Sequence, residues 1–403
     1  MSPQHEHIDV LVVGAGPTGL TAAAILAKLG VRVRVVEKST QRSDKSKALA
    51  VQAGTLECLG AAFGSALVNS LIAAGRPTQA VNIHVDDMAP RRVVFQSIPS
   101  QYNYILILAQ PETERILEQH LNSLGVQVER GVELTALQNS IEQVTGILTT
   151  SEGTSAITAK FVIGADGAHS EVRHAIRGEF EGGAYPGDFI LGDVLLKWPW
   201  PYGEVHTFVT EPGVVAAFPL KDERRYRLIL IPKGAKEALS AAIQLPEFQK
   251  ILDELTFGQV HVESSVWLTR FRISHRMVRE FHKGRVCLAG DAAHIHSPAG
   301  GQGMNTGIQD ALNLGYKLKA ILSGASIDRL QSYDDERMPV ARNILRGTDF
   351  FSRLMLLPEN PLTGFFRRHV FGRIAAVPPV QKRMLRAISQ VDIARREIAG
   401  YDS

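Results

Sequence analysis

The chain has 403 residues, too many for one hydrophobic core, so we expect at least two structural units. Its formal net charge of +3 is small for this length, and no block of like charges stands out, which argues against a nucleic-acid partner. Two cysteines, Cys58 and Cys287, cannot build a disulfide framework, and they favour a reducing cytoplasm. The short polar N-terminus does not match a signal peptide, and no apolar run reaches the roughly 18 residues of a membrane-spanning helix.

The first strand, turn and helix predict a site for a dinucleotide. An apolar strand is expected over residues 8–13, and a helix over 20–29. Between them stand three glycines in the spacing G-x-G-x-x-G: Gly14, Gly16 and Gly19. The first permits a tight turn, the second lets backbone approach a pyrophosphate, and the third lets helix and strand pack closely. A second strand over residues 31–36 leads to Glu37, which is placed to bind a ribose. This unit alone does not distinguish NAD from FAD.

Two later motifs indicate FAD. The segment FVIGADGAHS, residues 161–170, is a short strand followed by an Asp-Gly turn and a predicted helix. The segment GRVCLAGDAAH, residues 284–294, is a strand that ends near Asp291, and ligands of open α/β sheets bind at such carboxyl ends. Residues 298–305 then contain three glycines, so backbone can approach a flat ligand. A helix beginning at about Gly303 can stabilise negative charge on a reduced flavin.

Together the three motifs resemble those of the para-hydroxybenzoate hydroxylase family, the single-component (group A) flavoprotein monooxygenases. The resemblance covers roughly residues 8 to 345. It implies an α/β fold with a Rossmann-type (GR2-like) FAD-binding domain, an inserted β-sheet substrate domain and a C-terminal helical segment. The expected boundaries are 1–75, 102–179 and 273–345 for the FAD-binding domain, 76–101 and 180–272 for the substrate domain, and 346–403 for the helical segment.

The resemblance also implies a reaction. NAD(P)H would reduce non-covalently bound FAD, O2 would add at the flavin C4a, and the hydroperoxide would hydroxylate an aromatic or polyketide-like small molecule. The protein would contribute orientation, exclusion of water and electrostatics. Because no second G-x-G-x-x-G motif is present, NAD(P)H is expected to visit only transiently. The expected partners are the substrate and O2, with no nucleic acid and no membrane span, and the protein would be a monomer or a homodimer.

By the same resemblance, individual residues are expected to bind FAD. The glycines of the first turn would hold the pyrophosphate, Glu37 the adenosine ribose, and Asp291 the ribityl or phosphate region. Gln110 matches a glutamine that contacts the flavin. The flavin-facing loop would contribute Pro298, Gly301, Gly303, Met304 and Asn305. No catalytic residue is assigned, but Pro298, Gly301 and Gly303 of this loop are the candidates nearest to the reacting part of the flavin. The remaining expected cofactor ligands are Lys38, Arg42, Lys47 and Asp166. Lys47 replaces an arginine that is frequent in the family, and a lysine cannot make the same bidentate contact.

Alternating strands over residues 81–85, 92–95, 226–231 and 265–268 predict a substrate-covering sheet rich in aromatic side chains. Four residues are our candidates for the substrate pocket: His206, Phe208, Phe218 and Tyr226. No base is assigned, although His206, Tyr226 and Arg227 lie in this segment. The pattern Trp198-Pro199-Trp200-Pro201 begins like a halogenase signature but lacks its Ile-Pro, so chance is the favoured explanation.

The remaining segment, residues 346–403, is predicted to be helical and to pack on the body or cover the cavity. His294 and His296 have the spacing of a shared strand face, but no third and fourth metal ligands are evident. Three alternatives stay open. The protein could be an antibiotic-inactivating monooxygenase of the tetracycline or rifamycin type, an FAD-dependent reductase or dehydrogenase, or a non-catalytic flavin-binding protein.

Overall fold

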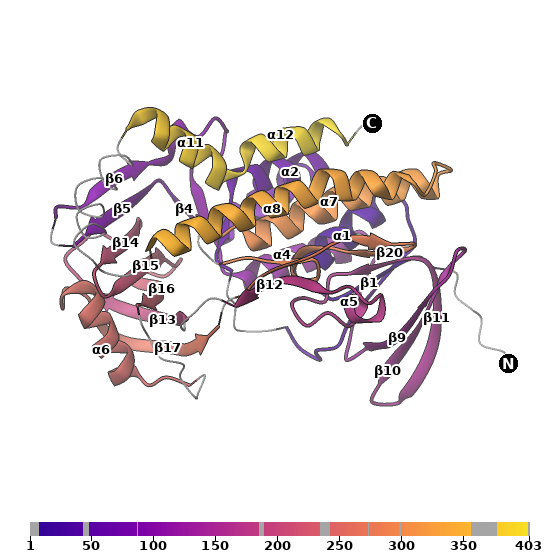
Figure 1. Ribbon diagram of the computed structural model, residues 1–403, viewed down its shortest axis with the longest axis horizontal. Helices are drawn as coiled ribbons and strands as arrows, with labels where there is room; N and C mark the ends of the chain where they lie inside the picture. The colour runs from indigo at the N-terminus through magenta and orange to yellow at the C-terminus, as the bar shows by residue number, and fades with distance from the viewer. Residues whose placement is uncertain are drawn as a thin grey trace.

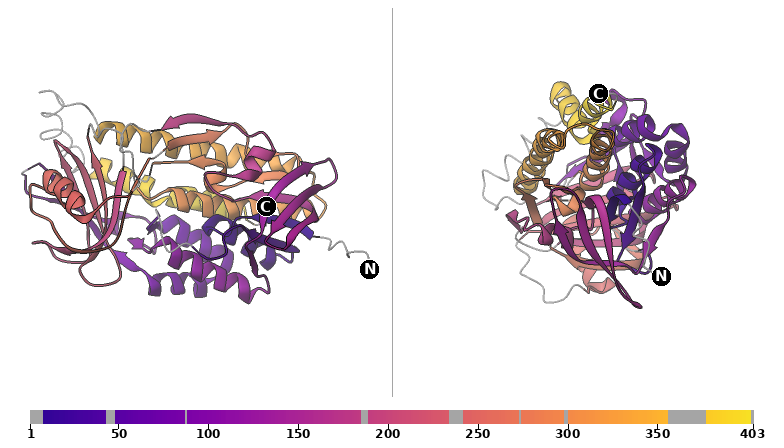
Figure 2. Two further views of the ribbon diagram at one scale, coloured as in Figure 1. Left: turned by 90° about the horizontal axis from the view of Figure 1, so that it is seen from below. Right: turned by 90° about the vertical axis from the view of Figure 1, so that its right-hand side faces the viewer.

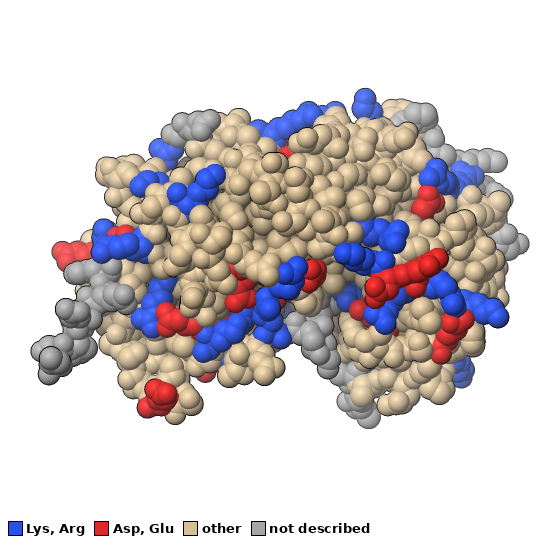
Figure 3. Space-filling model, turned by 180° about the vertical axis from the view of Figure 1, so that it is seen from behind, with Lys and Arg blue, Asp and Glu red and all other residues tan. Residues whose placement is uncertain are grey.

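Two large sheets lie towards opposite ends of the long axis of the molecule (Figures 1 and 2). The computed structural model describes residues 8–42, 48–86, 88–184, 189–233, 242–272, 274–297, 300–355 and 377–401. Within these ranges no helix is long and apolar enough to cross a membrane. Cationic and anionic side chains are interspersed on the face shown in Figure 3, in keeping with the small net charge.

The eight-stranded sheet carries the strands of all three sequence motifs. Its main path runs in the order β19-β20-β11-β1-β2-β8, and β10 and β9 extend it from β11. The strands are β1 (Ile8–Val13), β2 (Val33–Glu37), β8 (Val128–Arg130), β9 (Glu133–Asn139), β10 (Val144–Thr150), β11 (Gly153–Gly164), β19 (His282–Lys283) and β20 (Val286–Leu288). The pairs β20–β11, β11–β1, β1–β2 and β2–β8 are parallel. The apolar run of β1 is buried on both faces, as expected for a central parallel strand.

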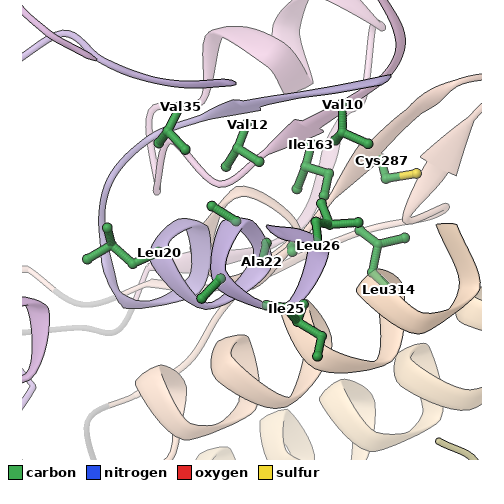
Figure 4. Packing of buried hydrophobic residues seen from close by; sticks show 14 of the residues in the cluster. Val10, Val12, Leu20, Ala22, Ile25, Leu26, Val35, Ile163, Cys287 and Leu314 are labelled. Atoms are coloured by element: carbon green, nitrogen blue, oxygen red, sulfur yellow. The ribbon is translucent and has the colours of Figure 1, made fainter. Parts of the chain in front are cut away.

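Helix α1 (Pro17–Lys28) lies between this sheet and helix α7 (Gly303–Leu322), as Figure 4 shows for Ile25 and Leu314. Two glycines of α7 allow the close approach. A Cβ atom at Gly307 would collide with Thr18, and one at Gly315 would collide with Ile25. Helix α4 (Gln110–Ser123) packs against α1 as well. The helices and the sheet therefore share one large hydrophobic core.

The seven-stranded sheet forms the other lobe, in the order β17-β13-β16-β15-β14-β5-β6. Its strands are β5 (Ala80–Val85), β6 (Arg91–Val94), β13 (Phe189–Lys197), β14 (Val205–Thr210), β15 (Gly213–Pro219), β16 (Arg225–Pro232) and β17 (His261–Phe271). All pairs are antiparallel except β14–β5. Helix α6 (Leu245–Thr256) covers one face, with Phe248 and Leu252 fully buried. The strands come from the two segments in which alternation predicted them.

Smaller elements connect the lobes. One three-stranded sheet contains β12 (Phe180–Ala184), β18 (Ser274–Val278) and β21 (His294–Ile295), and another contains β3 (Ala50–Val51), β7 (Ile105–Ile107) and β4 (Arg76–Thr78). Helices α2 (Ala53–Phe63) and α3 (Ser65–Ala74) follow β3, and the short α5 (Glu171–Ala175) follows β11. The 3-10 turns are η1 (Phe95–Ser97) and η2 (Gly290–Ala292).

The C-terminal helices pack on the body. Helix α8 (Arg329–Met355) runs without a break past residue 345, where the sequence suggested the end of the flavin unit. Helices α11 (Pro378–Ser389) and α12 (Val391–Ala399) follow, and α12 packs on α2 and α7. A Cβ atom at Gly54 of α2 would collide with the Gln390 carbonyl oxygen, which shows how close this contact is. The aromatic and basic stretch at residues 365–369 lies outside the described residues.

A buried ionic network fastens these helices together. The fully buried Arg337 of α8 donates from Nε to Asp310 Oδ1 of α7 at 2.7 Å and from Nη1 to Glu397 Oε1 of α12 at 2.6 Å. Asp310 Oδ2 lies 2.6 Å from Nε2 of His294 in β21. Burial alone would raise the pKa of Asp310, but Arg337 and His294 lower it to about 2. The network therefore holds the Asp310 carboxylate ionised.

Removing Glu397 should leave the buried Arg337 with one carboxylate fewer. We expect Glu397→Ala to lower the free energy of unfolding by about 3 kcal/mol or more, measured by urea denaturation. The control is Asp392→Ala on the same helix, because Asp392 pairs with Arg386 in an exposed ion pair and should cost about 1 kcal/mol or less. Equal losses in the two variants would show that the network does not stabilise the fold.

Candidate functional site

A cavity of about 930 Å³ lies between the glycine-rich motifs and the seven-stranded sheet. This is near the upper end of the range for small-molecule sites. One wall contains predicted cofactor residues: Gly16, Gln110, Asp291, Gly301, Gly303 and Met304. The facing wall contains apolar side chains of the sheet: Phe218, Ile229 and Phe271. The structure thus brings all three motifs together against an apolar surface.

The three glycines of the first turn differ in their surroundings: two are packed against backbone and one faces open space. Gly14 has φ of +102°, and a Cβ atom there would collide with the Ala165 carbonyl oxygen of the second motif. A Cβ atom at Gly19 would collide with the carbonyl oxygen of Gly14. At Gly16, in contrast, a Cβ atom would meet nothing within 4 Å, and Gly16 caps α1 without a side-chain hydrogen bond. The N–H groups of this helix end are therefore available to an anion such as a pyrophosphate.

The ribose-binding candidate Glu37 supports the same turn. Its carboxylate accepts hydrogen bonds from the backbone N–H of Ala15 at 2.9 Å and of Ser39 at 2.8 Å. The two oxygens of a carboxyl group have further acceptor sites, so a ribose hydroxyl can still bind. Lys38 lies next to it, and Arg42 is 3.4 Å from Glu118. The expected contacts of Lys47 and Pro298 lie outside the described residues.

The flavin-facing loop is held in place by Asn305. Its Oδ1 accepts from the backbone N–H of Gln52 at 2.8 Å, and its Nδ2 donates to the carbonyl oxygens of Ala50 at 2.8 Å and Gly301 at 2.7 Å. Asn305 is fully buried and is absent from the cavity wall. Its amide is thus occupied in fixing the loop, whereas a Cβ atom at Gly303 would meet nothing within 4 Å.

In the second motif, Asp166 holds the start of a helix and Arg173 lines the cavity. Asp166 accepts from Ser170 Oγ at 2.5 Å and from the Val172 N–H at 3.2 Å, so it stabilises the start of α5. Burial raises its pKa. Arg173 instead lines the cavity and donates to the carbonyl oxygens of Ala168 and Ala292 at 3.0 and 3.1 Å. Burial lowers its pKa. Val172-Arg173 was visible in the motif, but no sequence signal showed where the guanidinium would point.

His296 lies at the cavity, a position that its spacing from His294 in the sequence did not indicate. It lines the cavity, and neither ring nitrogen has a hydrogen-bond partner within the described ranges. Burial, with His294 nearby at 4.7 Å between ring centroids, lowers the pKa of His296 to about 3. It is therefore a neutral group with one donor and one acceptor to offer a ligand. As for a metal, the described residues contain no suitable group of three ligands.

Three of the four substrate-pocket candidates face away from the cavity. Phe208 and Tyr226 pack in the core under α6, and His206 Nδ1 lies 3.1 Å from Nε2 of the buried His84. Only Phe218 lines the cavity. Side chains alternate across a strand, so Arg227 faces the opposite side from Tyr226. Arg227 pairs with Asp193 at 2.6 and 2.8 Å, so this guanidinium is held in an ion pair and is no candidate for a base.

Comparison with known proteins gives the family. The protein-family model described as FAD binding domain matches residues 7–348 of this chain. The chain belongs to the group A flavoprotein monooxygenases. It is 34% identical over 388 residues to the uncharacterized aromatic compound monooxygenase YhjG of Bacillus subtilis, covering 96% of this chain and 76% of that one. It is 33% identical to the 6-methylpretetramide 4-monooxygenase of Streptomyces rimosus, covering 95% of this chain and 68% of that one.

Solved structures agree. The anhydrotetracycline hydroxylase OxyS of Streptomyces rimosus superposes with a TM-score of 0.79 at 31% identity, covering 96% of this chain and 76% of that one. The p-nitrophenol 4-monooxygenase PnpA of Pseudomonas putida shares the fold, with a TM-score of 0.82 at 24% identity, covering 95% of this chain and 99% of that one. The predicted fold class, the FAD cofactor and the enzyme class, an FAD-dependent monooxygenase, are thereby confirmed.

Gly16 offers a test of the cofactor site that separates binding from folding. Gly16→Ala adds a methyl group to open space, so the apoprotein should keep its stability while its affinity for FAD falls by about tenfold or more. Titration of the apoprotein with FAD, followed by flavin fluorescence, measures this loss. Gly19→Ala should destabilise the fold itself, because its methyl group meets backbone. Unchanged FAD affinity in Gly16→Ala would show that the pyrophosphate does not bind at this helix end.

His296 should make folding sensitive to acid. Its pKa in the folded protein, about 3, lies below the ordinary value of 6.5, so its contribution to stability is complete above pH 6.5 and is lost as the pH falls towards 3. At pH 5 this amounts to about 2 kcal/mol. The loss in free energy of unfolding between pH 7.5 and 5 should be smaller by that amount in His296→Gln. Identical pH profiles would show that His296 is accessible to protons in the folded state.

Proposed function

We propose that this enzyme uses NAD(P)H and O2 to hydroxylate an aromatic or polyketide-like small molecule in the 930 Å³ cavity. The observation that carries the proposal is the pairing of the two cavity walls. Backbone and polar groups of the flavin motifs form one wall, and Phe218, Ile229 and Phe271 form the other. A flat apolar ligand can lie between them. Relatives named as monooxygenases of 6-methylpretetramide, anhydrotetracycline and pentachlorophenol support this substrate class.

The residues present fit FAD. The open helix end at Gly16 suits the pyrophosphate, and Glu37 suits the ribose. The N-terminus of α7 has no side-chain cap, so it suits an electron-rich ring. Bound FAD would supply the redox chemistry, taking two electrons from NAD(P)H and activating O2. One oxygen atom enters the substrate and the other leaves as water. Three arginines on the cavity wall, Arg173, Arg272 and Arg276, suit the phosphates of a visiting dinucleotide.

The protein's own part in the reaction is to bind the substrate, to orient it and to exclude water from it. The apolar wall removes water from the reacting carbon. The neutral His296 can accept a hydrogen bond from a phenolic hydroxyl or donate one to a carbonyl oxygen, and so orient the ring. Both cysteines are free and buried, which fits the reducing cytoplasm that the sequence favours.

The test is NAD(P)H oxidation by the FAD-loaded protein with a panel of phenols, quinolones and polyketides, including tetracyclines and rifampicin. We expect at least one compound to accelerate oxidation and to gain about 16 mass units, one oxygen atom. Substrate turnover without O2 would indicate a reductase or dehydrogenase instead. Acceleration that yields only peroxide identifies a compound that binds without being hydroxylated. No acceleration across the panel would contradict the proposal and favour a flavin-binding protein without this activity.

A further inference from the structure

A second pocket opens on the seven-stranded sheet away from the flavin cavity. It has a volume of about 420 Å³, and its aromatic lining comes from Trp198, Trp200, Tyr202 and Tyr226. It shares no lining residue with the flavin cavity. Because Tyr226 and Arg227 are neighbours on β16 and face opposite ways, this pocket lies on the other face of the sheet from Phe218 and Ile229. Its lining includes both tryptophans of the Trp-Pro-Trp-Pro segment, for which the flavin reaction provides no role.

The aromatic rings form a continuous chain. Trp200 and Trp198 are 5.5 Å apart at an angle of 89°, Trp198 and Tyr226 are 4.4 Å apart at 66°, and Tyr226 and Tyr202 are 5.6 Å apart at 88°. Such edge-to-face contacts fix the rings relative to one another. Both tryptophans and Tyr202 pack on the core but remain partly accessible. They present a rigid aromatic wall on which a planar ligand can pack without further ordering of side chains.

The charged groups of this pocket carry a net positive charge. Arg224 lies 2.5 Å from Glu263, so these two neutralise each other. Lys197 also lines the pocket and has no ion pair among the described residues. Burial raises the pKa of both phenols, Tyr202 and Tyr226, so neither adds negative charge near neutral pH. A ligand that complements the pocket therefore combines an aromatic ring with one negative charge.

Arg224 adds a sign of local constraint. Its φ of +61° is uncommon for a residue other than glycine, and its carbonyl oxygen accepts from the Leu196 N–H at 3.0 Å. Backbone strain of this kind tends to gather where a binding surface is held in shape. Here it accompanies the Arg224–Glu263 pair that borders the pocket.

We propose that this outer pocket binds a small planar aromatic anion, such as an aromatic carboxylate, at a site separate from the flavin cavity. The ring of the ligand packs on the aromatic wall, and its carboxylate pairs with Lys197. The inference does not depend on the proposed hydroxylation, because no residue of the pocket lines the flavin cavity.

The placement of the tryptophans makes the proposal testable. The chain has three, of which two line the pocket, and Trp267 instead donates to Asp193 at 3.1 Å. In FAD-loaded Trp267→Phe, tryptophan fluorescence therefore reports on the outer pocket, while flavin absorbance reports on the cavity. The probes are benzoate, the neutral benzamide and the cationic benzylammonium. We expect benzoate to change the tryptophan emission saturably, benzamide to bind more weakly, and benzylammonium to cause no change.

A matched pair of lysine variants decides the role of charge. Lys197→Met should weaken benzoate binding about fivefold, whereas Lys250→Met, at an exposed position on α6 that does not line the pocket, should leave it unchanged. Calorimetric titration of the wild type and both lysine variants gives the same comparison without Trp267→Phe. The proposal is overturned by an absence of saturable response to benzoate, by equal binding in the two lysine variants, by tighter binding of benzylammonium, or by a response confined to the flavin absorbance.

Discussion

The close contact between α1 and α7 decides where the cavity forms. Gly307 and Gly315 bring α7 against Thr18 and Ile25, and a Cβ atom at Gly290 would also collide with Thr18. Thr18 is thus the point at which the first and third motifs meet. Both helices consequently begin at the same cavity, where Gly16 and Gly303 form part of its wall. Two positive helix ends at one site suit a cofactor that carries phosphates at one end and an electron-rich ring at the other.

The buried network around Arg337 extends this arrangement to the end of the chain. It links α7, α8 and α12 to His294, whose ring lies against that of His296 in the cavity wall. Burying a charged guanidinium is strongly destabilising unless its carboxylate partners stay in place. The C-terminal helices therefore belong to the same cooperative unit as the flavin motifs, although α12 lies far from them in sequence.

The fold and the cofactor were predictable because their signals are local. The spacing of the glycines and the strand endings at Glu37 and Asp291 are visible within short windows. The roles of Asp166 and Asn305 depend on which way one side chain turns, and the sequence does not contain that information. The ionic partners Asp310, Arg337 and Glu397 come from three distant helices, and each alone resembles an ordinary helix charge.

The choice of substrate-pocket residues meets a different limit. Alternation identifies the two faces of a strand, but it distinguishes them only when one face is polar. In β16, Leu228 and Leu230 lie under α6 while Ile229 faces the cavity, so both sets are apolar. The structure places His206, Phe208 and Tyr226 away from the cavity, and the alternation pattern alone does not show which face of the strand meets it.

The same two-sided sheet has a consequence for directed evolution. Phe218 and Ile229 line the cavity, whereas their strand neighbours Ala217, Leu228 and Leu230 belong to the core under α6. A library confined to the first set would reshape the space beside the flavin while leaving the second hydrophobic core intact. Substrate range and foldability are therefore encoded by interleaved residues of the same strands, and they can diverge independently.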